Sequence, residues 1–179
     1  MTAEQVIIAL IRIAGSLPVL RWPFWGALTA IVVDLSDLFW MNALDLGGVP
    51  DYQSFDKWLD VVYMATFLIV ALRWSGLTRR VAVGLFVFRI AGDLTFEVTQ
   101  ARAVLLAFPN VFEFWFVFVA ARDQFKPKYE ITLRRAVIWL LVLTAAKEFH
   151  EYALHLGKWF DQYTFFEFWS ALWHVLTPW

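Results

Sequence analysis

Long apolar segments separated by short polar connections run through almost the whole chain. A helix crosses the hydrocarbon core of a bilayer with about 20 mostly apolar residues. The pattern predicts such helices at 23–44, 54–74, 78–106, 109–124, 132–156 and 160–178. Residues 1–20 hold a shorter apolar stretch that Arg12, Gly15 and Pro18 interrupt, without the features of a signal peptide. We expect this stretch to be an amphipathic interfacial helix, and the rest to form an all-α, polytopic transmembrane helix bundle.

The composition excludes several classes of protein. Of the 179 residues, 61% are hydrophobic and only 17% are charged. Ordinary soluble domains have about 45–50% apolar and about 25% charged residues. The excess argues against a soluble enzyme, a disordered chain and a nucleic-acid-binding module. The absence of cysteine excludes disulfides and thiolate metal sites. Residues 1–179 are therefore expected to form one integral membrane domain, with lipids and no nucleic acid as partners.

Basic residues collect in the connections that follow the even-numbered spans. These are Arg73, Arg79, Arg80, Arg122, Lys126, Lys128, Arg134 and Arg135. With Arg12 and Arg21, they place 10 of the 15 basic residues on one side. The positive-inside rule makes that side cytoplasmic, with both termini there. The expected location is a prokaryotic cytoplasmic membrane. Most acidic residues fall in the opposite, outer half.

A weak threefold pattern divides the chain. Each of the pairs Arg21–Asp34, Arg80–Asp93 and Arg135–Glu148 separates a base from an acid by 13 residues. A Phe-acid-x-Trp tetrapeptide then begins the next span, at 55–58, 112–115 and 166–169. The pattern predicts three helical hairpins over 21–75, 76–125 and 126–179. Chance matches in an aromatic-rich chain are the alternative explanation.

Charged side chains inside a bilayer cost from about 2.5 to over 10 kcal/mol each, so they need partners. Arg89 with Asp93, and Lys147 with Glu151, are four residues apart and are expected to form structural ion pairs. The candidates for cation binding or proton relay are Asp34, Asp37, Glu97, Glu113, Glu148 and Glu151. Glu113 also follows Asn110, a favourable N-cap, so a carboxylate at the positive helix end is the structural alternative.

A candidate metal site lies on the 132–156 segment. Glu148, Glu151 and His155 share one helix face. Carboxylate and imidazole ligands suit a divalent ion such as magnesium, calcium, manganese, iron or zinc. The paired Glu-x-x-His motifs of di-iron bundles and the His-Glu-x-x-His motif are absent from the sequence.

Three functions fit these features. The first is a small cation or proton translocator, acting as an oligomer, because carboxylates at membrane depth attract cations. The second is a non-catalytic subunit of a larger membrane complex, in which the charges pair with one another or with a partner. The third is a metal-dependent membrane enzyme acting on a lipid or isoprenoid, with Arg102 holding an anionic head group.

Overall fold

The computed structural model describes residues 2–37, 40–41, 46, 48–50, 52–101, 104 and 107–151. All of the regular structure in these ranges is helical, as the sequence predicts. The elements in chain order are α1 (Ala3–Ser16), the 3₁₀-helix η1 (Leu17–Leu20), α2 (Pro23–Leu35), α4 (Tyr52–Ala71), α5 (Gly76–Thr99), α7 (Val111–Phe125) and α8 (Leu133–Glu151).

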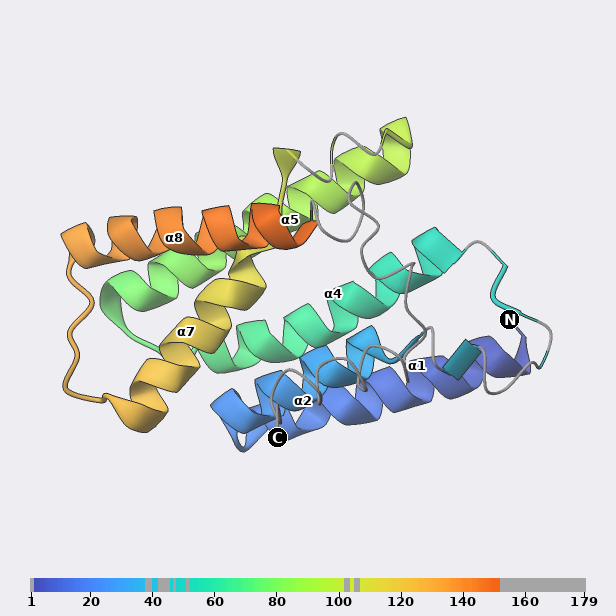
Figure 1. Cartoon of the computed structure of the whole chain (residues 1–179), viewed down its shortest axis with the longest axis horizontal. Coiled ribbons are helices and arrows are strands. Elements are labelled where there is room, and N and C mark those ends of the chain that lie inside the picture. The colour runs from blue at the N-terminus through green and yellow to red at the C-terminus, as the bar shows by residue number, and fades with distance from the viewer. Residues whose placement is uncertain are drawn as a thin grey trace, which may run out of the picture.

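The helices lie side by side and alternate in direction (Figure 1). Helix α1 runs from the N-terminus toward the end of the bundle on the left of the picture, and α2 returns along it. Helices α4 and α5 form a second such pair, followed by α7 and α8. The short η1–α2, α4–α5 and α7–α8 junctions therefore lie at one end of the bundle, and the N-terminus lies at the other.

Local sequence signals set the helix ends. Thr2 and Gln5 form a capping box at the start of α1. Pro18 sits in the first turn of η1, and Pro23 begins α2, where its missing N–H costs nothing. Gln100 ends α5 in the left-handed conformation, with φ of 52°. This end comes earlier than the predicted 106, because a residue in the left-handed conformation does not continue a right-handed helix.

Helix α7 forms the centre of the bundle and contacts α2, α4, α5 and α8. Its Phe112, Trp115, Phe116 and Val119 side chains are fully buried. On α4, Phe67 is also fully buried, and its ring stacks on Phe116 with centroids 4.3 Å apart. The core is therefore strongly aromatic near the middle of α7.

The outer surface of the bundle is apolar along most helices. Exposed fractions reach 86% for Val98 on α5, 68% for Trp58 on α4 and 67% for Leu141 on α8. In contrast, Glu4, Arg12, Asp37, Arg89, Glu113 and Lys147 are buried. Soluble proteins show the opposite preference, since charged residues are rarely fully buried and large exposed apolar patches mark contact surfaces.

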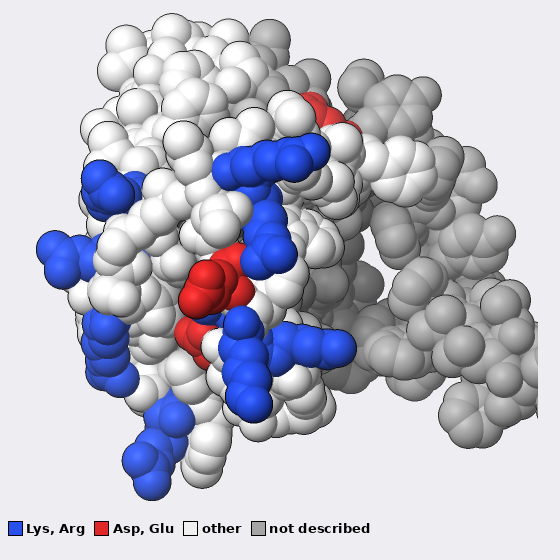
Figure 2. All heavy atoms as spheres, turned by 90° about the vertical axis from the view of Figure 1, so that its left-hand side faces the viewer, with Lys and Arg blue, Asp and Glu red and all other residues white. Residues whose placement is uncertain are grey.

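Lysine and arginine side chains surround one end face of the bundle (Figure 2). This is the end formed by the η1–α2, α4–α5 and α7–α8 junctions. We call it the basic end; its residues are Arg21, Arg73, Arg79, Arg80, Arg122, Lys126, Lys128, Arg134 and Arg135.

The N-terminal segment, which the sequence predicts as an amphipathic interfacial helix, forms α1 and η1. Both pack lengthwise against α2 and α4. The start of α1 lies at the end opposite the basic end, where Thr2 Oγ1 donates to the Gly48 carbonyl at 2.9 Å. The carboxylate of buried Glu4 accepts hydrogen bonds from the Leu46 and Gly48 backbone N–H groups, at 3.1 and 3.0 Å. The two ends of α1 are thus on opposite sides of the bundle.

Of the described residues, only the stretch Ala3–Leu20 is long and apolar enough on its own to cross a bilayer. Helix α2 is apolar but has 13 residues. Helices α4, α5 and α8 are longer and carry charged residues among the apolar ones. Helices α4, α5 and α8 could therefore cross a bilayer only if their charged residues are paired in the interior.

Candidate functional site: an arginine among four aspartates

Arg12 of α1 is surrounded by four aspartates from the two neighbouring helical segments. Asp34 lies at the end of α2, and Asp37 lies just after it. Asp56 and Asp60 lie in the first half of α4, one turn apart. We refer to these five residues as the Arg12 cluster. It lies in the half of the bundle away from the basic end, because α2 ends and α4 begins there.

Both terminal nitrogens of Arg12 are shared between helices. Nη1 lies 3.0 Å from Asp37 Oδ2 and 2.7 Å from Asp56 Oδ1. Nη2 lies 2.7 Å from Asp60 Oδ1 and also contacts Asp34 Oδ1. Each nitrogen thus joins the α2 side to α4. A planar guanidinium with several N–H donors suits such a role, which a lysine ammonium could not reproduce.

The cluster is buried and carries excess negative charge. The side chains of Arg12 and Asp37 are 3% and 2% exposed, whereas Asp34 and Asp56 are partly open at 30% and 34%. One guanidinium balances one of the four carboxylates, so three negative charges remain if all are ionised. One oxygen of Asp37, Oδ1, is buried with no hydrogen-bond partner among the described residues. An uncompensated buried charge is costly, so the cluster favours the uptake of positive charge.

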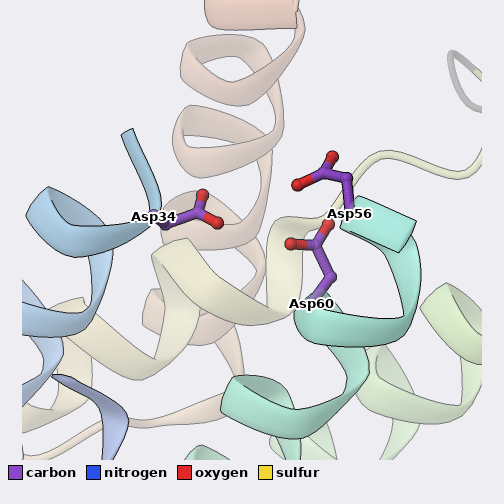
Figure 3. Close-up of side chains that lie close together, drawn as sticks. All are labelled: Asp34, Asp56 and Asp60. Atoms are coloured by element: carbon purple, nitrogen blue, oxygen red, sulfur yellow. The ribbon is translucent and has the colours of Figure 1, made fainter. Parts of the chain in front are cut away.

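Three of these carboxylates could share a cation. Oxygens of Asp34, Asp56 and Asp60 all lie within 4.8 Å of one another. Figure 3 shows the three carboxylates turned toward a common space between the end of α2 and the start of α4. Oxygen-only ligands suit hard ions such as Mg²⁺ or Ca²⁺. In this conformation, however, the Arg12 guanidinium contacts the same three side chains.

A second set of buried polar side chains joins the middle of α4 to the start of α7. Tyr63 Oη donates to Glu113 Oε2 at 2.9 Å, and Asn110 Nδ2 lies 3.1 Å from Tyr63 Oη and 3.2 Å from Glu113 Oε2. All three residues are buried. Asn110 also caps α7 by accepting from the Glu113 N–H at 3.4 Å. We call these residues the Glu113 network. Glu113 therefore has both the capping environment and a partner on another helix.

Helix α5 contributes a separate ion pair. Arg89 Nη2 lies 3.0 Å from Asp93 Oδ1, and Arg89 Nη1 donates to the Phe108 carbonyl at 3.0 Å. Phe108 also packs against Gly92, where a methyl group would approach the Phe108 Cβ to 2.3 Å. Arg89 thus joins α5 to the segment that leads into α7, in the structural role that the sequence suggests.

The remaining predicted residues lie apart from the Arg12 cluster. Glu97 is exposed on the last turns of α5. Glu148 lines a mainly apolar cavity of about 350 Å³, together with Phe88, Pro109 and Thr144. Lys147 Nζ lies 3.5 Å from His150 Nδ1 and above the Phe114 ring. The side chain of Glu151, with Arg102 and His155, falls outside the described residues, so the predicted Glu148–Glu151–His155 metal site and the Lys147–Glu151 pair are not described.

Sequence reasoning assigned Arg12 to the cytoplasmic side and missed its role. The signal was present, because Arg12 is the only charged residue in the apolar run from Val6 to Leu20. Such a residue requires a carboxylate on another helix. Asp56 and Asp60 were recognisable as an i, i+4 pair, but spacing alone could not show that they face α1. Tyr63 carried no distinguishing signal.

Comparisons with protein-family models, curated proteins and solved structures find no match for this chain.

Proposed function

We propose that this chain is an integral membrane protein that binds and translocates a small cation or the proton. The observation that carries the proposal is the charge excess of the Arg12 cluster, in which four carboxylates share one guanidinium. Inside a bilayer, such an excess is stable only if positive charge is taken up from solution.

The distribution of side chains supports a membrane environment. Apolar residues such as Leu10 on α1, Val32 on α2 and Val137 on α8 are exposed, while several charged residues, among them Arg12 and Arg89, are buried. Lipid can cover the apolar exterior, and Arg12 and Arg89 pair with carboxylates in the interior, where negative charge remains in excess. The basic end supports an orientation with that end in the cytoplasm. The Arg12 cluster would then lie toward the outer side.

The packing of the interior favours a carrier that changes conformation, and not a protein with a permanently open pore. Below the Glu113 network, Tyr63 contacts Phe67, which stacks on Phe116, and Phe116 stacks on Trp74 with centroids 5.2 Å apart. We call Phe67, Trp74 and Phe116 the aromatic layer. It separates the buried carboxylates from the basic end, so translocation would require this layer to move.

The test is cation flux in vesicles that contain the purified full chain. Uptake of H⁺, Na⁺, K⁺, Mg²⁺ and Mn²⁺ would be measured for wild type and Asp34→Asn, which removes one carboxylate without changing its size. Glu97→Gln is the matched control, because Glu97 is exposed and lies apart from the cluster. We expect wild type to transport at least one of these cations. Asp34→Asn should reduce the rate of transport, and Glu97→Gln should leave it unchanged. Folded wild-type protein without any flux would contradict it.

The metal-dependent enzyme remains a second proposal because the Asp34, Asp56 and Asp60 oxygens converge. Elemental analysis distinguishes it. A stoichiometric divalent metal that is lost in Asp56→Asn, in a protein without flux, would favour the enzyme. Stable co-purification with another membrane protein, again without flux or metal, would favour the accessory-subunit alternative.

A further inference from the structure

The Glu113 network extends the buried polar region beyond the Arg12 cluster. Asp56, Asp60 and Tyr63 follow one another at helical spacing on α4, so they share one face. Tyr63 then donates to Glu113 on α7. A line of titratable side chains therefore runs from the partly open Asp56 to the buried Glu113.

Fixed positive charges occupy the places where a metal ion would be most stable. Arg12 contacts Asp34, Asp56 and Asp60, so a metal ion could bind these oxygens only by displacing it. Arg89 on α5 is a second buried guanidinium in the interior, where it pairs with Asp93. A metal ion moving toward Glu113 would be repelled by both guanidinium groups. A proton needs no such space, because it joins an oxygen already present.

The chemistry of the Tyr63 hydroxyl, which lies between the Arg12 cluster and Glu113, also favours the proton over a metal ion. A tyrosine hydroxyl both donates and accepts hydrogen bonds, so it can receive one proton while it releases another. It is a poor replacement for the several oxygen ligands that a hard metal ion needs. The Glu113 carboxylate is hydrogen-bonded by Tyr63 on α4 and Asn110 on α7. Lys147 on α8 lies above the ring of the next residue, Phe114.

We infer that the ion handled by this site is the proton, and that Glu113 receives it from the Arg12 cluster through the Tyr63 hydroxyl. The inference rests on the proposed function and specifies its substrate. Protonated Asp60, three residues before Tyr63 on the same face of α4, would first turn from Arg12 toward Tyr63 Oη. In the transfer step, the Tyr63 O–H proton then moves to Glu113 Oε2 while Tyr63 Oη accepts the Asp60 proton. Tyr63 is neutral before and after, and one proton has moved from Asp60 to Glu113.

The aromatic layer defines the end of this transfer. Phe67 and Phe116 are fully buried and offer no group that can bind a proton. In this conformation the proton would stay on Glu113 until the layer opens. Glu113 is therefore a buried proton-holding residue, distinct from the more open aspartates that first take up the proton.

The experiment measures proton uptake into vesicles that hold a trapped pH-sensitive dye, with a potassium ionophore supplying the membrane potential. Tyr63→Phe keeps the ring that contacts Phe67 and removes only the hydroxyl. We expect the rate of proton uptake to fall by about a hundredfold, the usual scale for loss of a positioned proton-transfer group. Tyr129→Phe is the matched control, because the Tyr129 hydroxyl accepts a hydrogen bond from Trp139 Nε1 near the basic end, at 3.2 Å. Glu113→Gln should give the same loss as Tyr63→Phe.

Size-exclusion chromatography in detergent shows whether each variant is folded, and Tyr63→Phe is the variant expected to fold if Glu113→Gln does not. Normal proton uptake by Tyr63→Phe would overturn the inference. Transport of Mn²⁺ or Na⁺ without proton movement would overturn it too, while the proposed function would stand. Absence of flux for every cation in folded wild type would overturn both.

Discussion

Arg12 Nη2 lies 2.7 Å from Asp60 Oδ1, although the two residues are 48 positions apart in the sequence. This contact joins α1 to α4 in the interior of the bundle. The side chain of Arg12 is 3% exposed, so the contact is buried and specific in geometry. It makes α1 an integral part of the bundle and places its one arginine at the centre of the candidate site.

Arg12→Leu should destabilise the protein by about 3–5 kcal/mol, the usual cost of removing one partner from a buried ion pair. The loss should shrink as the pH falls. Without Arg12, the folded variant binds more protons than the unfolded chain, because protonation relieves repulsion among the four aspartates. Its free energy of unfolding therefore rises with falling pH. Denaturant titration at several pH values tests this, with Arg21→Leu at the basic end as the control.

Asp34→Asn should leave the free energy of unfolding within about 1 kcal/mol of wild type, or raise it, because it removes one of the uncompensated charges. Asp34 is 30% exposed, so its amide can still meet water. Transport should nevertheless fall. A large loss of stability together with unchanged flux would indicate that Asp34 only holds the helices together.

Close packing at Gly26 gives a test of how α2 packs on η1. A methyl group at Gly26 would lie 2.2 Å from the Val19 backbone nitrogen, which cannot move without disturbing η1. Gly26→Ala should therefore reduce thermal stability. Gly84→Ala is the matched control, since nothing lies within 4 Å of a methyl group there and alanine favours a helix. Equal stability of the two variants would contradict the packing of α2 on η1.

Orientation can be tested by labelling, because the chain contains no cysteine. A membrane-impermeant maleimide applied to intact cells should react with Leu46→Cys, which is exposed beside the start of α1. Lys128→Cys at the basic end should react only after the cells are permeabilised. An epitope tag before Met1 should be accessible from outside, together with Leu46→Cys. A tag that is accessible only from the cytoplasm would contradict the placement of α1 as a helix that crosses the membrane.

The order of the described helices and the approximate limits of α4, α5 and α7 could be predicted from the sequence, because apolar length, prolines and N-caps act locally. Helix α2 ends at Leu35, before the predicted 44, and the predicted 160–178 span lies outside the described residues. Asn110, for example, was recognisable as the cap of α7. The partners of Arg12 could not be predicted, since they depend on how three helices pack and hydropathy does not encode that packing. The same limit explains why Asp34 and Asp37 join the candidate site, whereas Glu97 on α5 stays exposed.

The Glu113 network illustrates a different limit. Glu113 was a candidate from its charge alone, and its need for a partner on another helix followed from the cost of burial. That the partner is Tyr63, at 2.9 Å, depends on the close approach of α4 and α7. Tyrosines are common near membrane interfaces, so nothing in the sequence marked this one as buried.

The most direct test of the account is the rate of proton uptake into vesicles by Asp60→Asn, compared with wild type at the same membrane potential. Asp60 belongs to the Arg12 cluster and is one turn from Tyr63. We expect wild type to take up protons and Asp60→Asn, while still folded, to lose nearly all of this activity. Equal proton uptake by the two proteins would contradict it.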